Sequence, residues 1–266
     1  MELGLCLEMI FTKDPLEERM RKAARAGMRN VEIWFTDMTW KQGPEELAAA
    51  ALRAGVRVTN TVIGSPDGSI GGGLTDPAKR PQWLERAKAT LEFNRRAGIP
   101  ATIVCTGNEV AGQSAEDTRR SVLEGLKQTA RLAEKAGITL LLEVLNTRVD
   151  HAGYWLSSSD EGARLCREVG SERLKLLFDC YHLQVQEGDV AKHIEASLDV
   201  IGHFHSAGVP GRHELHEGEV NYAWLLPAIE RMGYRGVFAL EYSPSIDDER
   251  SLAGTLERLG GAARWR

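Results

Sequence analysis

Four side chains that can bind a metal ion stand at the ends of apolar, β-favouring stretches of the chain. They are Glu143 after residues 140–142, Asp179 after 176–178, His205 at the end of 200–205, and Glu241 after 237–240. One polar residue at a strand end is common, but four in succession indicate a shared site. Three carboxylates that converge without a cation repel one another, so some would have to be protonated. A bound divalent ion removes this repulsion.

The ligand types indicate which ion such a site would take. Three carboxylates and one imidazole are typical of sites for Mn²⁺, Mg²⁺ or Co²⁺, in which water or substrate oxygens complete the coordination. Fe²⁺ is an alternative, and Zn²⁺ is a weaker one because no thiolate belongs to the set. We therefore predict a divalent metal site formed by Glu143, Asp179, His205 and Glu241.

A recurring sequence pattern indicates which secondary-structure elements bring these side chains together. Charged, helix-favouring stretches end in Gly, and a short β-rich run follows. Examples are Leu-Arg-Ala-Gly-Val (52–56), Arg-Arg-Ala-Gly-Ile (95–99) and Glu-Lys-Ala-Gly-Ile (134–138). Glycine ends helices because it adopts the left-handed conformation readily. The chain therefore alternates helix and strand, which predicts parallel strands with right-handed crossovers.

The pattern predicts eight strands and eight helices. The strands are expected at 3–9, 31–35, 56–59, 101–104, 138–142, 174–178, 200–205 and 236–240. The helices are expected at about 15–26, 45–53, 79–96, 115–135, 160–169, 189–198, 222–232 and 248–259. This predicts an α/β fold, a single (β/α)8 TIM barrel that forms one domain over residues 1–266, with its chemistry where strands end. An open doubly wound sheet is disfavoured because no Gly-x-Gly-x-x-Gly turn follows the first strand. Gly71-Gly72-Gly73 is expected in a loop over the site.

The composition limits the partners and the compartment. The net charge of −5 mixes both signs, whereas a nucleic-acid or membrane surface needs clustered Lys and Arg. The N-terminus lacks a signal-peptide pattern, and no stretch approaches the roughly 20 apolar residues of a membrane span. The four cysteines have no metal-binding spacing. We expect a cytoplasmic protein with reduced cysteines and no nucleic-acid or membrane partner; a homo-oligomer is left open.

Several longer motifs resemble one family. They are Glu-Val-Leu-Asn (143–146), Phe-Asp-Cys-Tyr-His-Leu-Gln (178–184), Gly-His-Phe-His-Ser-Ala (202–207), Pro-Gly-Arg-His-Glu (210–214), Gly-Glu-Val-Asn-Tyr (218–222) and Glu-Tyr-Ser-Pro (241–244). The chain resembles the hydroxypyruvate isomerase family of the xylose-isomerase-like (sugar phosphate isomerase/epimerase) TIM barrels, most densely from 138 to 244. Two positions depart from the family. His205 stands where hydroxypyruvate isomerases often carry Gln and epimerases carry His, and Glu8 replaces a small or amide residue.

The resemblance implies an isomerase of a small hydroxy-oxo acid, such as hydroxypyruvate interconverting with tartronate semialdehyde. Protons would move through a metal-stabilised enediolate, with Glu143 and Glu241 as catalytic acid and base as well as metal ligands. A 2-oxo-tetronate isomerase or a ketose 3-epimerase on the same barrel is the alternative, followed by a polyol dehydratase and a non-catalytic sugar-acid-binding protein. An endonuclease for abasic DNA is disfavoured by the charge of −5 and the seven histidines.

Two further residues are expected to bind the substrate, a small hydroxy-oxo acid or a sugar. His182, three residues after Asp179, would hydrogen-bond a substrate oxygen; the alternative is a loop histidine that caps the following helix. Arg212, in a loop after the seventh strand, would bind a substrate carboxylate with its forked guanidinium. The alternative for Arg212 is a surface or subunit-contact arginine.

The remaining polar and aromatic residues near the strand ends have other expected places. His203 is expected to point away from His205 towards the helix layer, and Glu32 and Trp34 could face either side of the second strand. Tyr154 and Trp155 are possible walls of the pocket. We expect packing roles for Trp40, Trp83 and Trp224, and loop structure for His213, Glu214 and His216.

Overall fold

The strands form one parallel sheet that curves into a barrel. The computed structural model describes residues 1–64 and 73–265, with the backbone alone for 37 and 38; Gly71 and Gly72 of the expected loop lie outside these residues. Within these ranges the strands are β1 (Glu2–Cys6), β2 (Asn30–Glu32), β3 (Arg57–Val58), β4 (Asn60–Ile63), β5 (Ala101–Val104), β6 (Thr139–Glu143), β7 (Leu174–Asp179), β8 (Ile201–Ser206) and β9 (Val237–Leu240). Their order is β3-β2-β1-β9-β8-β7-β6-β5-β4.

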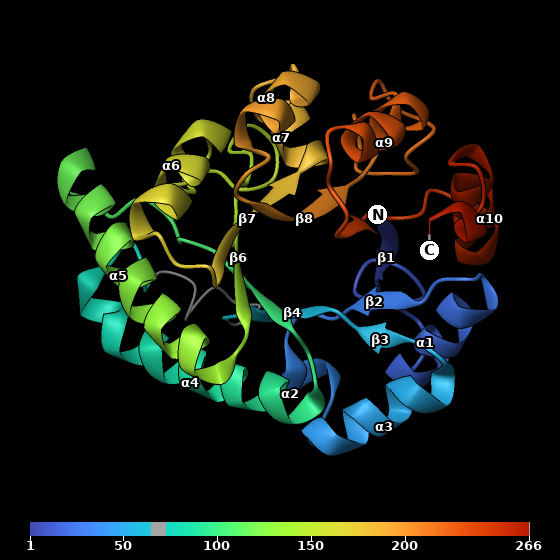
Figure 1. Ribbon diagram of the computed structural model, residues 1–266, viewed down its shortest axis with the longest axis horizontal. Helices are drawn as coiled ribbons and strands as arrows, with labels where there is room; N and C mark the ends of the chain where they lie inside the picture. Colours follow the sequence, from blue (N-terminus) through green and yellow to red (C-terminus); the bar gives the residue numbers. More distant parts are fainter. Residues whose placement is uncertain (65–72, 266) are drawn as a thin grey trace.

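The helices lie around the outside of the strands (Figure 1). They are α1 (Leu16–Arg25), α2 (Thr36–Thr39), α3 (Pro44–Ala54), α4 (Arg80–Ala97), α5 (Ala115–Ala136), α6 (Ser159–Val169), α7 (Cys180–Gln186), α8 (Val190–Ser197), α9 (Tyr222–Arg231) and α10 (Asp248–Arg258), with 3₁₀ turns η1 (Pro77–Lys79) and η2 (Ala262–Arg264). The eight predicted helices are confirmed, and α2 and α7 are short additions. Each of the helices α3 to α6 ends at a glycine in the left-handed conformation, as the recurring sequence pattern predicts. These glycines are Gly55 (φ of 78°), Gly98 (70°), Gly137 (73°) and Gly170 (68°).

The third predicted strand is longer than expected, and its extension closes the barrel. Its first half, β3, pairs with β2, and its second half, β4, pairs with β5. Between the halves, the Thr59 amide donates to the Val31 carbonyl at 2.9 Å. The prediction stopped at Thr59, but the strand continues through Thr61, which is buried and whose hydroxyl donates to the side-chain oxygen of Asn94 of α4 at 3.1 Å. The predicted (β/α)8 barrel is confirmed.

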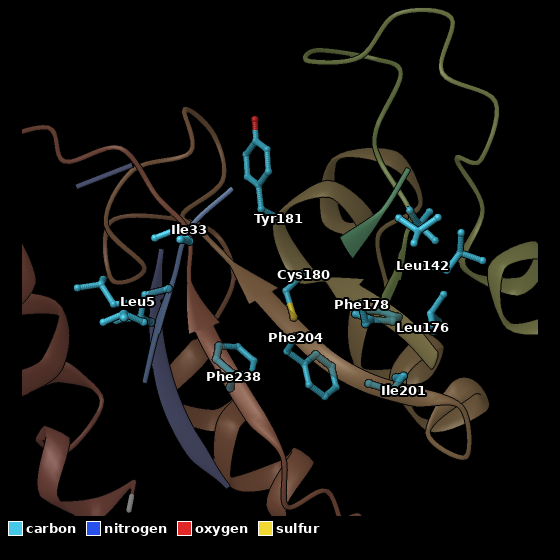
Figure 2. Close-up of a cluster of buried hydrophobic side chains, with 14 of the residues drawn as sticks. Leu5, Ile33, Leu142, Leu176, Phe178, Cys180, Tyr181, Ile201, Phe204 and Phe238 are labelled. Atoms are coloured by element: carbon cyan, nitrogen blue, oxygen red, sulfur yellow. The ribbon is translucent and has the colours of Figure 1, made fainter. Parts of the chain in front are cut away.

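Side chains of the strands alternate between the helix layer and the barrel interior. Figure 2 shows Phe178, Phe204 and Phe238 in the helix-facing core, where the ring centroids of Phe204 and Phe238 lie 5.5 Å apart. The next residue on each strand therefore points into the barrel. For β7 and β8 these inward residues are Asp179 and His205, two of the predicted metal ligands.

A bulge in β8 adjusts this alternation below the site. Leu176 of β7 faces Ile201, and the next residue, Leu177, faces His203, so Gly202 is the extra residue on β8. A Cβ atom at Gly202 would lie 2.5 Å from the Cβ of Lys175. The bulge places both Ile201 and Phe204 in the helix-facing core (Figure 2), while His203 remains inside.

The cysteine and tryptophan side chains also had places predicted from the sequence. The four cysteines all lie in the described ranges and are free. Trp40 and Trp83 are buried, as expected. The expectation is wrong for Trp224, which lies in the first turn of α9 and is 53% exposed. Among the described residues, no helix is long and apolar enough to cross a membrane.

Candidate active site

The four predicted metal ligands meet at the carboxyl ends of four consecutive strands. Glu143, Asp179, His205 and Glu241 each offer one ligand atom, these atoms lie within 4.8 Å of one another, and all four residues are buried. Nδ1 of His205 lies 3.4 Å from a carboxylate oxygen of Glu143 and 3.4 Å from one of Glu241. The parallel register brings them together, since Asp179 pairs directly with His205 on the neighbouring strand.

The unpaired nitrogen of His205 indicates that this group of residues fits a cation. His205 Nδ1 is fully buried, and among the described residues it has no hydrogen-bond partner. Three carboxylate oxygens and one imidazole nitrogen at these separations are a suitable donor set for a divalent ion with oxygen-rich coordination. The buried, unpaired Nδ1 of His205 therefore supports a cation site independently of the sequence pattern.

The pKa values of His205, Asp179 and Glu241 are shifted by burial and by the neighbouring charges. Burial lowers the pKa of His205, but Glu241 and Glu32 outweigh burial and raise it well above its ordinary value. Burial raises the pKa of Asp179 and outweighs Arg212, which lowers it, and the neighbouring Glu241 raises it further. Burial also favours the neutral form of Glu241, yet His205 and Arg212 lower its pKa below the usual range. A protonated His205 thus supplies the positive charge that a bound cation would replace.

A fourth buried carboxylate, Glu32, to which the sequence assigned no role, lies behind His205. Glu32 of β2 contacts Nε2 of His203 at 2.6 Å through one oxygen and Nε2 of His205 at 2.9 Å through the other. The expectation that His203 faces the helix layer is wrong, because residues two apart on a strand point to the same side. Applied to β8, this rule would have found His203 from the sequence. The histidines outweigh burial and lower the pKa of Glu32 to about 2.

Above these residues lies a cavity of about 860 Å³ whose walls include the other predicted site residues. Glu143, His182, Arg212 and Glu241 line it, together with Tyr154. Tyr154 was expected there; its hydroxyl donates to the Glu143 carbonyl at 3.1 Å and accepts from the Thr106 amide at 2.9 Å. These bonds hold the end of β6, and with it the Glu143 side chain, against the cavity.

The two proposed catalytic carboxylates have different surroundings. Glu241 accepts hydrogen bonds from Nη2 of Arg212 and, at 3.3 Å, from the indole nitrogen of Trp34. Glu143 accepts only the weak thiol donor of Cys105, at 3.7 Å, besides its contact with His205, as far as the described residues show. Glu241 is therefore the more strongly stabilised carboxylate, and Glu143 has more free lone-pair capacity for a proton.

Arg212 lies in the cavity wall and not on the outer surface. Its side chain is 19% exposed, and its guanidinium carbon lies 5.3 Å from the centre of the Tyr181 ring. Its backbone is in the left-handed region with φ of 59°. Its Nε is buried and has no hydrogen-bond partner in the described part of the chain, which leaves a charged donor for a ligand.

The loop that carries Arg212 is tied to the following strand end. Glu214 is buried and accepts hydrogen bonds from the Ser245 amide at 2.9 Å and the Ser251 hydroxyl at 2.7 Å. These bonds lower the pKa of Glu214 to about 2 despite its burial, which acts in the opposite direction. Glu214 is therefore loop structure, as predicted, and it anchors the segment that presents Arg212.

His182 is held in one tautomer by Asn146. The Asn146 side-chain oxygen accepts from the amides of Val149 and Asp150 at 3.0 and 3.1 Å, so its NH₂ group faces the other way. This NH₂ group lies 2.7 Å from Nδ1 of His182, which must therefore be the acceptor. The proton of the neutral ring is then on Nε2.

The Nε2 proton of His182 is available to a ligand. This nitrogen is buried and has no hydrogen-bond partner among residues 1–64 and 73–265. Burial, reinforced by Arg212, lowers the pKa of His182 to about 3, so the ring stays neutral. The alternative role of His182 as a helix cap is wrong, because α7 is capped by Asp179, which accepts from the Tyr181 and His182 amides at 2.7 and 3.1 Å.

Glu8, a departure from the family that the sequence placed in the first strand, lies just after β1 and also lines the cavity. One of its oxygens accepts from the Thr39 hydroxyl at 2.7 Å and from the Trp34 amide at 3.3 Å, and Arg19 lies 3.5 Å from the other. Glu8 thus holds α2 against the cavity wall, and Arg19 balances its charge.

Comparisons with known proteins agree with this architecture. Residues 20–259 match the model of the family described as xylose isomerase-like TIM barrel. The chain is 34% identical to the 2-oxo-tetronate isomerase of Cupriavidus necator over 96% of this chain and 97% of that protein. It is 30% identical to the hydroxypyruvate isomerase of Escherichia coli over 92% and 95% of the two chains. Both relatives are named isomerases, in agreement with the predicted class.

Solved structures show the same barrel. A protein described as AP endonuclease, family 2, from Brucella melitensis superimposes with a TM-score of 0.87 at 27% identity, covering 96% of this chain and 98% of that one. The D-psicose 3-epimerase of Clostridium cellulolyticum superimposes with a TM-score of 0.79 over 98% of each chain. At 18% identity the second likeness concerns the fold alone.

Proposed function

Because the chain belongs to the xylose isomerase-like TIM barrel family, we propose that it is an isomerase of a small hydroxy-oxo acid of the hydroxypyruvate or 2-oxo-tetronate type. The names of the relatives supply the reaction class. The observation that carries the substrate class is the place of Arg212, a cation in the cavity wall beside Glu241. We also propose that residues 1–266 form a single domain.

The proposed metal ligands are Glu143, Asp179, His205 and Glu241, with Mn²⁺, Mg²⁺ or Co²⁺ as the preferred ions. A bound divalent ion would act as a Lewis acid that stabilises negative charge on the substrate oxygens during proton transfer. The orphaned His205 Nδ1 and the three convergent carboxylates support this assignment.

Glu143 and Glu241 would move the carbon-bound proton. In hydroxypyruvate, one carboxylate removes a proton from the hydroxymethyl carbon, and a proton is returned to the neighbouring carbon. At the same time the hydroxyl proton passes from the first oxygen to the former carbonyl oxygen, so the product is tartronate semialdehyde. Glu143 is the better candidate for the first base, because Arg212 and Trp34 already donate to Glu241.

His182 and Arg212 would orient the substrate for this transfer. The Nε2–H group of His182 is a neutral donor that can bind a substrate oxygen without competing for the moving proton. Arg212 offers donors to the carboxylate end, and its planar fork fixes which carbon faces the two glutamates. Correct orientation of the reacting carbon is a large part of catalysis in such sites.

The metal site can be tested directly in crystals. Anomalous scattering from crystals soaked in Mn²⁺ is expected to place one ion within bonding distance of Glu143, Asp179, His205 and Glu241. An ion bound in the cavity away from these four side chains would contradict the assignment. Soaks with Mg²⁺ in excess serve as the control, since displacement of the Mn²⁺ signal shows competition for one site.

The His182 tautomer gives a second test through Asn146. Replacing Asn146 with Asp exchanges the NH₂ donor, at 2.7 Å from Nδ1 of His182, for an acceptor and leaves the more distant backbone amide of this residue, at 3.3 Å. The tautomer with the proton on Nδ1 is then favoured, and Nε2 becomes an acceptor. We expect kcat/KM to fall about 10–100-fold, the range for a lost hydrogen bond in a buried site. Asn221→Asp is the matched control, because Asn221 caps α9 and Asp caps equally well. Equal kcat/KM values in both variants would contradict the proposed role of His182.

Two alternative functions are each favoured by one observation. His205, the ligand type of the epimerases, favours a ketose 3-epimerase, which a panel of acids and ketoses separates from the acid isomerase. An abasic-DNA endonuclease, the description given to the Brucella structure, is tested with an abasic oligonucleotide and the same metals. We expect no cleavage of that oligonucleotide, because the charge of −5 provides no basic surface. A cytoplasmic location stays a prediction.

A further inference from the structure

We propose that Glu32 is a positioning residue that fixes His205 in the tautomer whose Nδ1 can bind the metal ion. The inference rests on the proposed metal site and concerns a residue outside its four ligands. It is carried by the different surroundings of the two ring nitrogens of His205. One nitrogen faces the single carboxylate of Glu32, and the other faces the carboxylates of Glu143 and Glu241.

The distances assign the two nitrogens different tasks. Nε2 of His205 lies 2.9 Å from Oε2 of Glu32, which is hydrogen-bond distance. Nδ1 lies 3.4 Å from each of the two facing carboxylates and has no hydrogen bond among the described residues. A neutral imidazole carries one proton, and a buried carboxylate at Nε2 retains it there. The lone pair is then on Nδ1 and points at the metal position.

Glu32 also contacts His203 through its other carboxylate oxygen. The second oxygen of Glu32, Oε1, lies 2.6 Å from Nε2 of His203, and Glu32 and His203 are both buried. With one oxygen on each histidine, the carboxylate cannot rotate without losing a contact. Carboxylates that orient a metal-bound histidine in this way raise its basicity, and their loss typically weakens metal binding about 10–100-fold.

The barrel interior is shaped to allow this contact between strands that are not neighbours. β1 and β9 lie between β2, which carries Glu32, and β8, which carries His205. The inward residues nearest to this contact are small: Gly4 and Cys6 on β1 and Ala239 on β9. A Cβ atom on Gly4 would lie 3.2 Å from the Cβ of Ala239. Large side chains here would fill the space that the Glu32 carboxylate crosses.

A buried Glu–His contact could also serve stability alone, and a double-mutant cycle separates the two roles. Glu32→Gln removes the charge and one acceptor. His205→Asn keeps a donor atom near the Nδ1 position but is too short to reach Glu32. If Glu32 acts through Nε2 of His205, the effect of Glu32→Gln on metal binding disappears in the His205→Asn background. A purely structural role predicts the same effect in both backgrounds.

The measurement is calorimetric titration of metal-free protein with Mn²⁺, supported by thermal unfolding of each variant. We expect Glu32→Gln to weaken Mn²⁺ binding about 10–100-fold in the wild-type background and less than about 2-fold in the His205→Asn background. Glu187→Gln is the matched control, because Glu187 also lies beside a histidine, 3.9 Å from His193, but outside the site. Unchanged binding in Glu32→Gln, or equal weakening in both backgrounds, overturns the proposal.

Wild-type protein provides a test that does not depend on the folding of a variant. With ¹⁵N-labelled histidine and diamagnetic Mg²⁺ or Zn²⁺, we expect the His205 Nε2 resonance to remain protonated and the Nδ1 resonance to shift. Loss of the one-bond N–H coupling at Nε2 on metal binding overturns the role of Glu32 while leaving the metal site in place. Failure of wild-type protein to bind Mn²⁺ in the titration overturns the metal site itself.

Discussion

Glu143→Gln and Glu241→Gln are each expected to lower kcat by about 10²–10⁴-fold, the usual contribution of general acid–base catalysis, with little change in KM. Glutamine keeps the shape and one ligand oxygen of the side chain but cannot accept the substrate proton. Both side chains line the cavity. The loss therefore concerns proton transfer and not the binding of the substrate.

The measurement is steady-state turnover of hydroxypyruvate at saturating Mn²⁺, with metal content determined for each variant because both residues are also proposed ligands. Glu187→Gln, outside the site, controls for the loss of a partly buried carboxylate. Near-normal kcat in either variant with metal bound contradicts the catalytic role of that residue. A loss of activity that disappears when Mn²⁺ is raised above the concentration that saturates the wild type assigns the residue to metal binding alone.

Arg212→Lys is expected to lower kcat/KM for hydroxypyruvate and 2-oxo-tetronate about 10–100-fold, since hydrogen bonds to charged groups contribute about 1.5–3 kcal/mol. Lysine keeps the charge but loses the planar fork that binds a carboxylate through two donors. Fructose and tagatose carry no carboxylate, so any activity on them should change less.

The comparison with ketoses is needed because Arg212 also donates to Glu241. An effect transmitted through Glu241 would lower turnover of acids and ketoses alike, so only the difference between the two classes reports on the substrate carboxylate. Equal effects on both classes, or no effect on the acids, contradict the proposed clamp. If a ketose is the best substrate of the wild type, the epimerase alternative replaces the acid isomerase.

The sequence by itself determined the barrel and the four proposed ligands. Helix-ending glycines such as Gly55 and Gly137 are local signals, because the left-handed conformation is a property of the single residue. Glu143 and Asp179 could be placed because each follows an apolar strand directly. The parallel arrangement then brings such strand ends together whatever the details of packing.

Tertiary structure decided the features that depend on contacts across the barrel. Glu32 meets His205 across two intervening strands, so neither sequence distance nor strand neighbourhood indicates the pair. The predicted third strand, 56–59, was too short, because β4 continues it through polar Thr61, whose hydroxyl is satisfied by Asn94 of α4. The inward place of Arg212 depends on a loop anchored elsewhere by Glu214. In each case a polar group is satisfied by a partner distant in sequence, and only the folded chain determines which partner that is.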